Sequence, residues 1–318
     1  MHEAAHWISD YSSQHICTAA QLCEYGRPVD SDSISDFERF RALQNLSTGN
    51  RCGLTMSLRL PEQPGPHTDG YTQALLTEAS LMYRHLPGKL RLKQLQVQGN
   101  PALLTPAQLK QLFDGLRKHF SLPANNFAWF GIEIQPEQAD WSMLGSLRDA
   151  GFNRITLHAA PDCLRATQHL YEAARALQYN TISIRIQTPD SNLQALCQAM
   201  RLQPDRILLN GPTPAASTLS LLQDAGYLMA SPSCFVLPDD ELAEAATLSG
   251  LPCTHDCNRL VLGLGSGACS HLGRLHYCND AQPQTYMDSL AANQLPAASG
   301  HRCSLPAQNQ PGAASRMT

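Results

Sequence analysis

The sequence lacks any apolar run of the roughly 20 residues that a membrane-spanning helix needs. It is also poor in charge, because only 16% of its 318 residues are Asp, Glu, Lys or Arg, and the net charge is -4. Nucleic acids and anionic membranes bind surfaces with clustered positive charge, which this balance does not favour. We therefore expect neither a nucleic-acid partner nor a membrane partner.

The N-terminal residues also lack the pattern that is typical of a secretory leader. The N-terminal residues, MHEAAHWISDYSSQ, contain no basic segment followed by an apolar stretch. The 11 cysteines are odd in number and scattered, which is typical of reduced thiols rather than of a secreted disulfide framework. Together these features predict a cytoplasmic protein.

Hydrophobic residues make up 43% of the chain, enough for a substantial core. Residues 1–50 lack clear periodicity and are interpreted as an N-terminal arm. Residues 51–232 are interpreted as a barrel, and residues 233–295 as its C-terminal extension. Residues 296–318, rich in Ala, Gln, Pro and Ser, are predicted to be a disordered tail.

Within the predicted barrel, short β-type runs alternate with helical patterns. One helix is predicted from Thr105, an N-cap followed by proline, and another from Thr213. Glycine ends a helix and an aromatic residue opens the next strand at Gly151-Phe152 and again at Gly226-Tyr227. The β-type runs lie at 54–60, 91–97, 127–134, 153–158, 180–186, 205–209 and 227–230.

Strands that alternate with helices indicate parallel pairing with right-handed crossovers. We therefore predict an α/β fold with a partial (β/α)6 TIM-like barrel. A doubly wound sheet is the alternative, since periodicity alone does not separate the two folds.

Four segments, in this order, resemble the oxygen-independent coproporphyrinogen III oxidase family of the radical S-adenosylmethionine (SAM) superfamily. The first and longest is IEIQPEQADWSMLGSLRDAGFNRITL at 132–157. The others are Pro204-Asp205-Arg206, PDDELA at 238–243 and GLGSGA at 263–268. The resemblance implies a radical SAM partial barrel, a 4Fe-4S cluster, SAM, and decarboxylation of tetrapyrrole propionates.

That chemistry requires three cysteine thiolates in a CxxxCxxC loop after the first strand, which leave one iron free to bind SAM. Here the first predicted strand is followed by PEQPGPHTDGY, and no cysteine occurs between Cys52 and Cys163. The oxygen and imidazole groups of that loop are poor ligands for such a cluster. The sequence therefore predicts a degenerate family member, with neither a 4Fe-4S cluster nor SAM expected as cofactors.

The resemblance also identifies vestigial SAM-site positions. Glu133 stands where the family has a carboxylate that contacts SAM, and Arg154 is retained as well. Of the family's glycine-rich motif after the second strand, Gly99 remains. A family aspartate and a family tyrosine are replaced by Ser183 and Ser57.

Two further candidates follow from the residues alone. His158 lies near the C-terminal end of a predicted strand, where barrel enzymes place active-site groups. Cys253 and Cys257 form a Cys-x-x-x-Cys pair, but position 260 is leucine, so the pair is a weak metal candidate and no metal site is predicted. The GxGxxA run at 263–268 is interpreted as a tight turn, because no helix pattern follows it.

The leading hypothesis is a pseudoenzyme whose barrel binds a tetrapyrrole, a haem-related molecule or a partner protein in a regulatory role. The first alternative is an active coproporphyrinogen III dehydrogenase-like enzyme of porphyrin biosynthesis that needs a partner subunit. The second alternative is an enzyme that uses the barrel mouth for non-radical chemistry.

Overall fold

The structure is a computed structural model that describes residues 32–46, 54–66, 68–122, 129–187, 193–210, 214–231, 233–243, 260–296 and 298–302. Within these residues thirteen strands form one sheet, in the order β1-β13-β12-β11-β10-β2-β3-β4-β5-β6-β7-β9-β8. The strands are β1 (Asp32–Ile34), β2 (Leu54–Arg59), β3 (Leu92–Gln98), β4 (Trp129–Ile134), β5 (Arg154–Ala159), β6 (Thr181–Gln187), β7 (Arg206–Asn210), β8 (Leu228–Ser231), β9 (Cys234–Val236), β10 (Leu260–Leu264), β11 (Cys269–Leu272), β12 (Leu275–Asn279) and β13 (Ala298–Arg302).

The helices follow the strands in an alternating order. They are α3 (Asp36–Gln44), α4 (Thr68–Tyr83), α5 (Pro106–His119), α6 (Trp141–Ala150), α7 (Leu164–Ala176), α8 (Leu193–Leu202), α9 (Ala216–Asp224) and α11 (Pro283–Ala291). Two short 3-10 turns, η1 (Pro101–Leu103) and η2 (Pro136–Gln138), follow β3 and β4. No helix of the described residues is long and apolar enough to cross a membrane.

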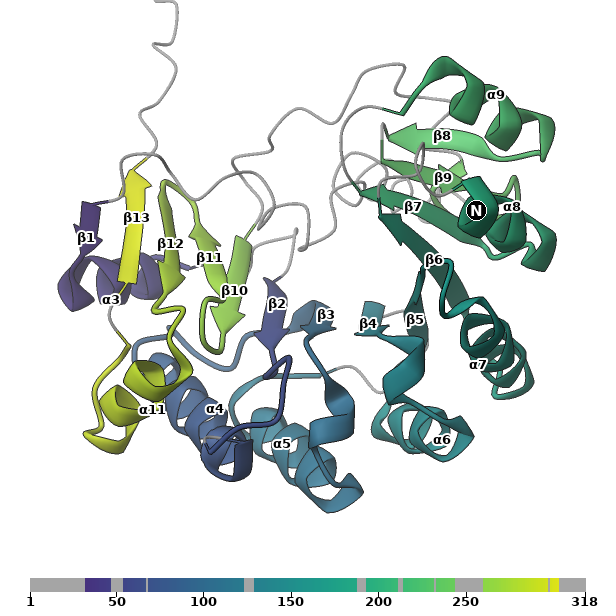
Figure 1. Cartoon of the computed structure of the whole chain (residues 1–318). Coiled ribbons are helices and arrows are strands. Elements are labelled where there is room, and N and C mark those ends of the chain that lie inside the picture. The colour runs from purple at the N-terminus through teal and green to yellow at the C-terminus, as the bar shows by residue number, and fades with distance from the viewer. Residues whose placement is uncertain are drawn as a thin grey trace, which may run out of the picture.

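Strands β2 to β7 are parallel neighbours in chain order, which makes them the six barrel strands that the sequence predicts. The sheet curves, and helices α4 to α8 lie along its convex outer side (Figure 1). A doubly wound sheet would carry helices on both faces, so this alternative is wrong. The edges β8 and β1 do not pair with each other, and the barrel is therefore partial.

Local signals place the outer helices as predicted. Thr105 caps α5 through a capping box with Gln108, and Leu112 and Leu116 on the apolar stripe are fully buried. Gly151 ends α6 with a φ of 107°, a conformation that glycine adopts without steric cost. The prediction for α9 is wrong in its start, because that helix begins at Ala216, and Thr213 lies outside the described residues.

Of the predicted arm and tail, the structure describes residues 32–46, 296 and 298–302, and the rest lies outside the described residues. β1 and β13 pair with each other in antiparallel register, so residues 32–34 and 298–302 are ordered parts of the sheet. Ser35 caps α3 in a capping box with Glu38, and Arg302 donates hydrogen bonds to Glu38. The chain around Ala298 was predicted to be disordered because its composition is polar and small, but two distant strands satisfy each other's backbone groups here.

The strands of the predicted C-terminal extension, residues 233–295, belong to the same sheet as the barrel strands. β10 lies parallel to β2 on the side away from β3, and it extends the barrel sheet by one more parallel strand. β11, β12 and β13 then continue the sheet as antiparallel strands. The C-terminal extension is therefore continuous with the barrel.

Glu78 of α4 joins this extension to the barrel. Its carboxylate is fully buried and accepts hydrogen bonds from the Gly265 backbone N–H at 2.9 Å, from Asn279 Nδ2 at 2.6 Å and from the Tyr286 hydroxyl at 2.7 Å. These donors come from the glycine-rich turn after β10, from β12 and from α11. Burial raises the pKa of Glu78 to about 7, although the three hydrogen bonds act in the opposite direction.

This buried carboxyl gives a prediction for stability against pH. The folded chain keeps a proton on Glu78 that the unfolded chain releases above pH 4.5, so the free energy of unfolding falls as the pH rises from 4.5 through 7. We expect wild type to lose about 3 kcal/mol more than Glu78→Gln between pH 5 and pH 8, measured by urea denaturation, since one pKa unit corresponds to about 1.4 kcal/mol. An identical pH dependence of the two proteins would contradict this prediction.

Candidate functional site

A cavity of about 500 Å³ opens at the C-terminal ends of the parallel strands. Each of the six barrel strands contributes a polar side chain to its lining. In strand order from β2 to β7 these side chains belong to Arg59, Gln98, Glu133, His158, Arg185 and Asn210, and Gln187 of β6 is an additional one. The carboxyl end of a barrel is where this fold places ligand sites, so the mouth is the candidate site.

Glu133 is the electrostatic centre of the mouth. Arg185 donates from one guanidinium nitrogen to Glu133 Oε1 at 2.7 Å and from the other to Asn210 Oδ1 at 2.7 Å. His158 Nε2 lies 3.5 Å from Glu133 Oε2. Burial raises the pKa of Glu133, but the hydrogen bond to His158 and the positive charge of Arg185 outweigh it, and the net pKa lies below its usual value. Glu133 is therefore ionised at neutral pH.

The rim on the β2 side carries a more accessible cation. Arg59 exposes 36% of its side chain and donates to Glu62 Oε1 at 3.2 Å and to the Gly267 carbonyl oxygen at 3.2 Å. Gly99 lines the mouth next to it with a φ of 95°, and a Cβ there would lie 2.2 Å from the Leu60 carbonyl oxygen. Only glycine fits at this position, because any side chain would collide with the backbone of the loop after β2.

Three of the four predicted site residues meet in the mouth. Glu133 and His158 interact directly, and Gly99 lies in the same lining. Arg154 does not line this cavity, and its assignment as a vestigial SAM-site position stays a prediction from the resemblance. It is the first residue of β5, whereas the mouth is formed by the last residues of the strands.

Arg154 serves instead at the opposite end of the barrel. It forms a two-point ion pair with Glu241, with contacts of 2.5 and 3.2 Å, and its guanidinium lies 4.1 Å from the centre of the Trp129 ring. Arg206 pairs with Asp240 at 2.8 Å and with Glu241 at 2.7 Å, and it lies 4.7 Å from the same ring. These cations, carboxylates and Trp129 close the N-terminal end of the strands.

Sequence reasoning missed Arg185, which is only 3% exposed and holds the mouth together. The signal in the sequence was a charged residue between Ile184 and Ile186 on a buried strand. Its side chain projects to the same face of the strand as those of Ser183 and Gln187. A buried charge requires a partner, so this pattern could have predicted an acidic group on a neighbouring strand.

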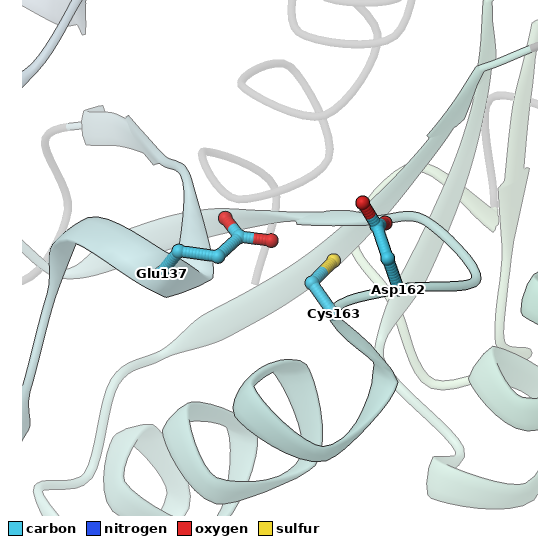
Figure 2. Close-up of side chains that lie close together, drawn as sticks. All are labelled: Glu137, Asp162 and Cys163. Atoms are coloured by element: carbon cyan, nitrogen blue, oxygen red, sulfur yellow. The ribbon is translucent and has the colours of Figure 1, made fainter.

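A second group of reactive side chains lies beside the mouth (Figure 2). The ligand-type atoms of Glu137, Asp162 and Cys163 all lie within 4.8 Å of one another. Burial raises the pKa of Cys163, and its sulfur accepts a hydrogen bond from the Ala160 backbone N–H at 3.2 Å. Glu137 and Asp162 are exposed, and exposed acidic groups commonly lie together without an ion, so we assign no metal to the group.

The cysteine predictions have mixed outcomes. Cys253 and Cys257 lie outside the described residues. Cys163, Cys197 and Cys234 carry free thiols, as predicted. Cys269 and Cys278 form a disulfide, so the prediction of reduced thiols is wrong for this pair. The two cysteines stand directly opposite each other on β11 and β12, a relation that the spacing of nine residues did not reveal.

No family model matches the sequence. The sequence is 31% identical to the oxygen-independent coproporphyrinogen III oxidase of Pseudomonas aeruginosa, in an alignment 284 residues long that covers 73% of this chain. This chain belongs to the oxygen-independent coproporphyrinogen III oxidase family. The protein of the same name from Escherichia coli is 25% identical over 239 residues.

The fold agrees with this assignment. The solved structure of coproporphyrinogen III oxidase from Escherichia coli, a radical SAM enzyme, matches with a TM-score of 0.72 at 20% identity, covering 90% of this chain and 80% of its own. The barrel therefore has the radical SAM type of architecture. The matches cover 61% of the Pseudomonas relative and 51% of the Escherichia relative, so the chain spans about half to three fifths of these proteins.

The residues after β2 do not fit the iron–sulfur cluster of a radical SAM coproporphyrinogen III oxidase. The described part of that loop, residues 60–66, contains no cysteine, and the whole sequence has none between Cys52 and Cys163. A 4Fe-4S cluster is held by cysteine thiolates, which the carboxylate of Glu62 and the amide of Gln63 do not replace.

The ion pair of this coproporphyrinogen III oxidase family member gives a second prediction. Arg185→Met leaves Glu133 buried without its main cation, and we expect the free energy of unfolding to fall by about 3 kcal/mol, measured by urea denaturation at pH 7. The double variant Arg185→Met/Glu133→Gln removes both charges and should recover most of that loss. If the double variant is as unstable as the sum of the two single variants, the pair does not couple as the geometry requires.

Proposed function

We propose that this family member performs no reductive cleavage of SAM by itself, and that it is a pseudoenzyme whose barrel mouth binds a tetrapyrrole. The observation that carries the first part is the loop after β2. The observation that carries the second part is the open polar mouth at the carboxyl end of an intact barrel. The role that follows is one of binding or regulation in haem-related metabolism.

The electron path supports the loss of radical chemistry. Reductive cleavage of a sulfonium requires an electron from a cluster whose fourth iron contacts SAM. Without three thiolates next to β2, this chain has no means of placing that iron at the mouth. Ser57 and Ser183 are both buried where the resemblance implies a tyrosine and an aspartate, so two further polar groups of the family site are replaced.

The charge pattern supports the same conclusion. The resemblance implies that the Glu133 carboxylate contacts SAM, which is a cation at its sulfur. Here Arg185 already supplies a positive charge at 2.7 Å from that carboxylate and is held on its other side by Asn210. A cationic ligand would have to approach a carboxylate that is already neutralised by a tethered guanidinium.

The mouth nevertheless suits a small molecule. Its volume of about 500 Å³ is within the range of ligand pockets, and its lining combines charged and amide groups. Arg59 at the rim is the accessible cation, and a guanidinium binds carboxylates in a two-point geometry. Tetrapyrroles of this family's pathway carry several carboxylates, so a propionate is the natural partner of Arg59.

The loss of radical chemistry is tested by anaerobic reconstitution of the purified chain with iron and sulfide. We expect no stable incorporation of about four irons per chain and no 5′-deoxyadenosine from SAM and a reductant. The Escherichia coli enzyme treated in parallel is the positive control. Formation of 5′-deoxyadenosine by this chain alone would overturn the first part of the proposal and favour an active enzyme.

Tetrapyrrole binding is tested by titrating the chain with coproporphyrin III and following its fluorescence. We expect a saturable change, weakened about tenfold or more in Arg59→Ala because a charge-assisted hydrogen bond is lost. Lys110→Ala removes an exposed cation from the outer helix α5 and should bind like wild type. A titration without saturation would exclude the ligand-binding form of the proposal, and equal affinities of the two variants would exclude Arg59 as the anchor.

A further inference from the structure

The antiparallel hairpin formed by β11 and β12 carries a Cys-x-His-x4-His-x-Cys pattern, from Cys269 to Cys278. The register pairs Cys269 directly with Cys278 and His271 directly with His276. Residues that stand opposite each other in an antiparallel pair project to the same face, and so do residues two positions apart on one strand. All four side chains therefore lie on one face of the hairpin.

The opposite face of the hairpin is committed to the core. Leu275, Tyr277 and Asn279 alternate with the histidine and cysteine of β12 and are all buried. Asn279 binds Glu78, and Tyr277 packs near Arg39. This packing fixes which way the strand faces, and it holds His276 and Cys278 on the other side.

The four ligand-type groups form two cross-strand pairs on this face. The imidazole rings of His271 and His276 have centroids 3.6 Å apart. The sulfurs of Cys269 and Cys278 are joined in a disulfide, and their Cα atoms are 3.9 Å apart. The cysteine pair forms one row across the hairpin and the histidine pair forms another. The two rows are two residues apart along each strand, which is about 6.8 Å. An imidazole extends farther from the backbone than a thiolate, so a shared metal would lie nearer the cysteine row.

We propose that the reduced hairpin is a zinc site with the ligand set Cys269, His271, His276 and Cys278. Two thiolates and two imidazoles match the preference of Zn²⁺ for sulfur and nitrogen in a four-coordinate site. The disulfide and the metal both require the two sulfurs, so the two states exclude each other. The hairpin thus carries either a covalent cross-link or a metal.

The exchange between the two states is chemically balanced. A dithiol reductant gives two electrons and two protons to the disulfide, which becomes two cysteine thiols while the reductant becomes a disulfide. Zn²⁺ then binds with release of the two thiol protons, because thiolates are the metal ligands. The reverse reaction, in which a disulfide oxidant re-forms the cross-link, expels the metal.

His301 of β13 offers a matched neighbour outside the ligand set. It stands opposite His276 on the same face, with ring centroids 4.9 Å apart, and its side chain is exposed. The three rings are arranged in a row, so His301 lies on the far side of His276 from His271. Its removal should leave the four ligands intact.

The test uses the full chain and Co²⁺ as a spectroscopic probe for zinc. Protein reduced with a dithiol and desalted without oxygen should bind Co²⁺ with thiolate-to-cobalt charge-transfer absorbance, and Zn²⁺ should displace it. We expect Cys269→Ser/Cys278→Ser to lose this absorbance, and His276→Ala, which changes a half-buried residue, to bind at least tenfold more weakly. His301→Ala and Cys197→Ser should match wild type. Undiminished absorbance in the double cysteine variant would overturn the zinc site.

The alternation between the two states has its own readout. Trypsin cleaves at the exposed Arg274 in the turn between the strands, so the two peptides stay joined only while the disulfide is present. We expect a linked peptide pair from oxidised protein, separate peptides after reduction, and protection of Cys269 and Cys278 from alkylation by added Zn²⁺. Equal alkylation with and without Zn²⁺, in a protein whose circular dichroism is unchanged, would contradict the proposal.

Discussion

The ion pair between Glu133 and Arg185 is the interaction on which the barrel mouth depends. A carboxylate and a guanidinium removed from water are tolerated only when each is neutralised and hydrogen-bonded. Here β4 supplies the anion and β6 the cation, while β7 supplies the amide of Asn210 as a second acceptor. This arrangement fixes side chains on three strands and leaves a polar cavity above them.

The two ends of the barrel differ in how closely they resemble the family. At the N-terminal end Arg154 and Arg206 lie against the Trp129 ring and are paired with carboxylates of the chain that follows the barrel. These arginines and carboxylates belong to the segments that carry the family resemblance. At the carboxyl end the described residues of the loop after β2, residues 60–66, contain no cysteine. The resemblance is therefore strongest where the residues maintain the fold and weakest where they would perform the reaction.

Prediction from sequence succeeded where the signal was local. The capping box at Thr105 and the glycine at Gly151 fix helix ends through neighbouring residues, and the alternation of strands and helices follows from them. Prediction failed where the local structure depends on residues that are distant in the sequence. β1 and β13 are short strands that exist because they pair with each other across the whole chain. Arg154 was grouped with Glu133 and Gly99 because a family position does not reveal how far along its strand a residue lies.

The site was predictable in part for the same reason. Glu133 and Gly99 were identified from the family resemblance and His158 from its place near a strand end. Arg185, in contrast, is an isolated charge in an apolar strand whose partner lies on another strand. The cross-strand cysteines were interpreted as independent thiols because only the register of the hairpin brings them together. In each case the missing information was the pairing of strands.

A mouth to which every barrel strand supplies at least one side chain has an evolutionary consequence. Each of these residues lies near the C-terminal end of a strand. The hydrogen bonds that hold the strand in the sheet are made by the backbone and not by the side chain. Exchange of one residue can therefore alter what the protein recognises while the frame remains unchanged.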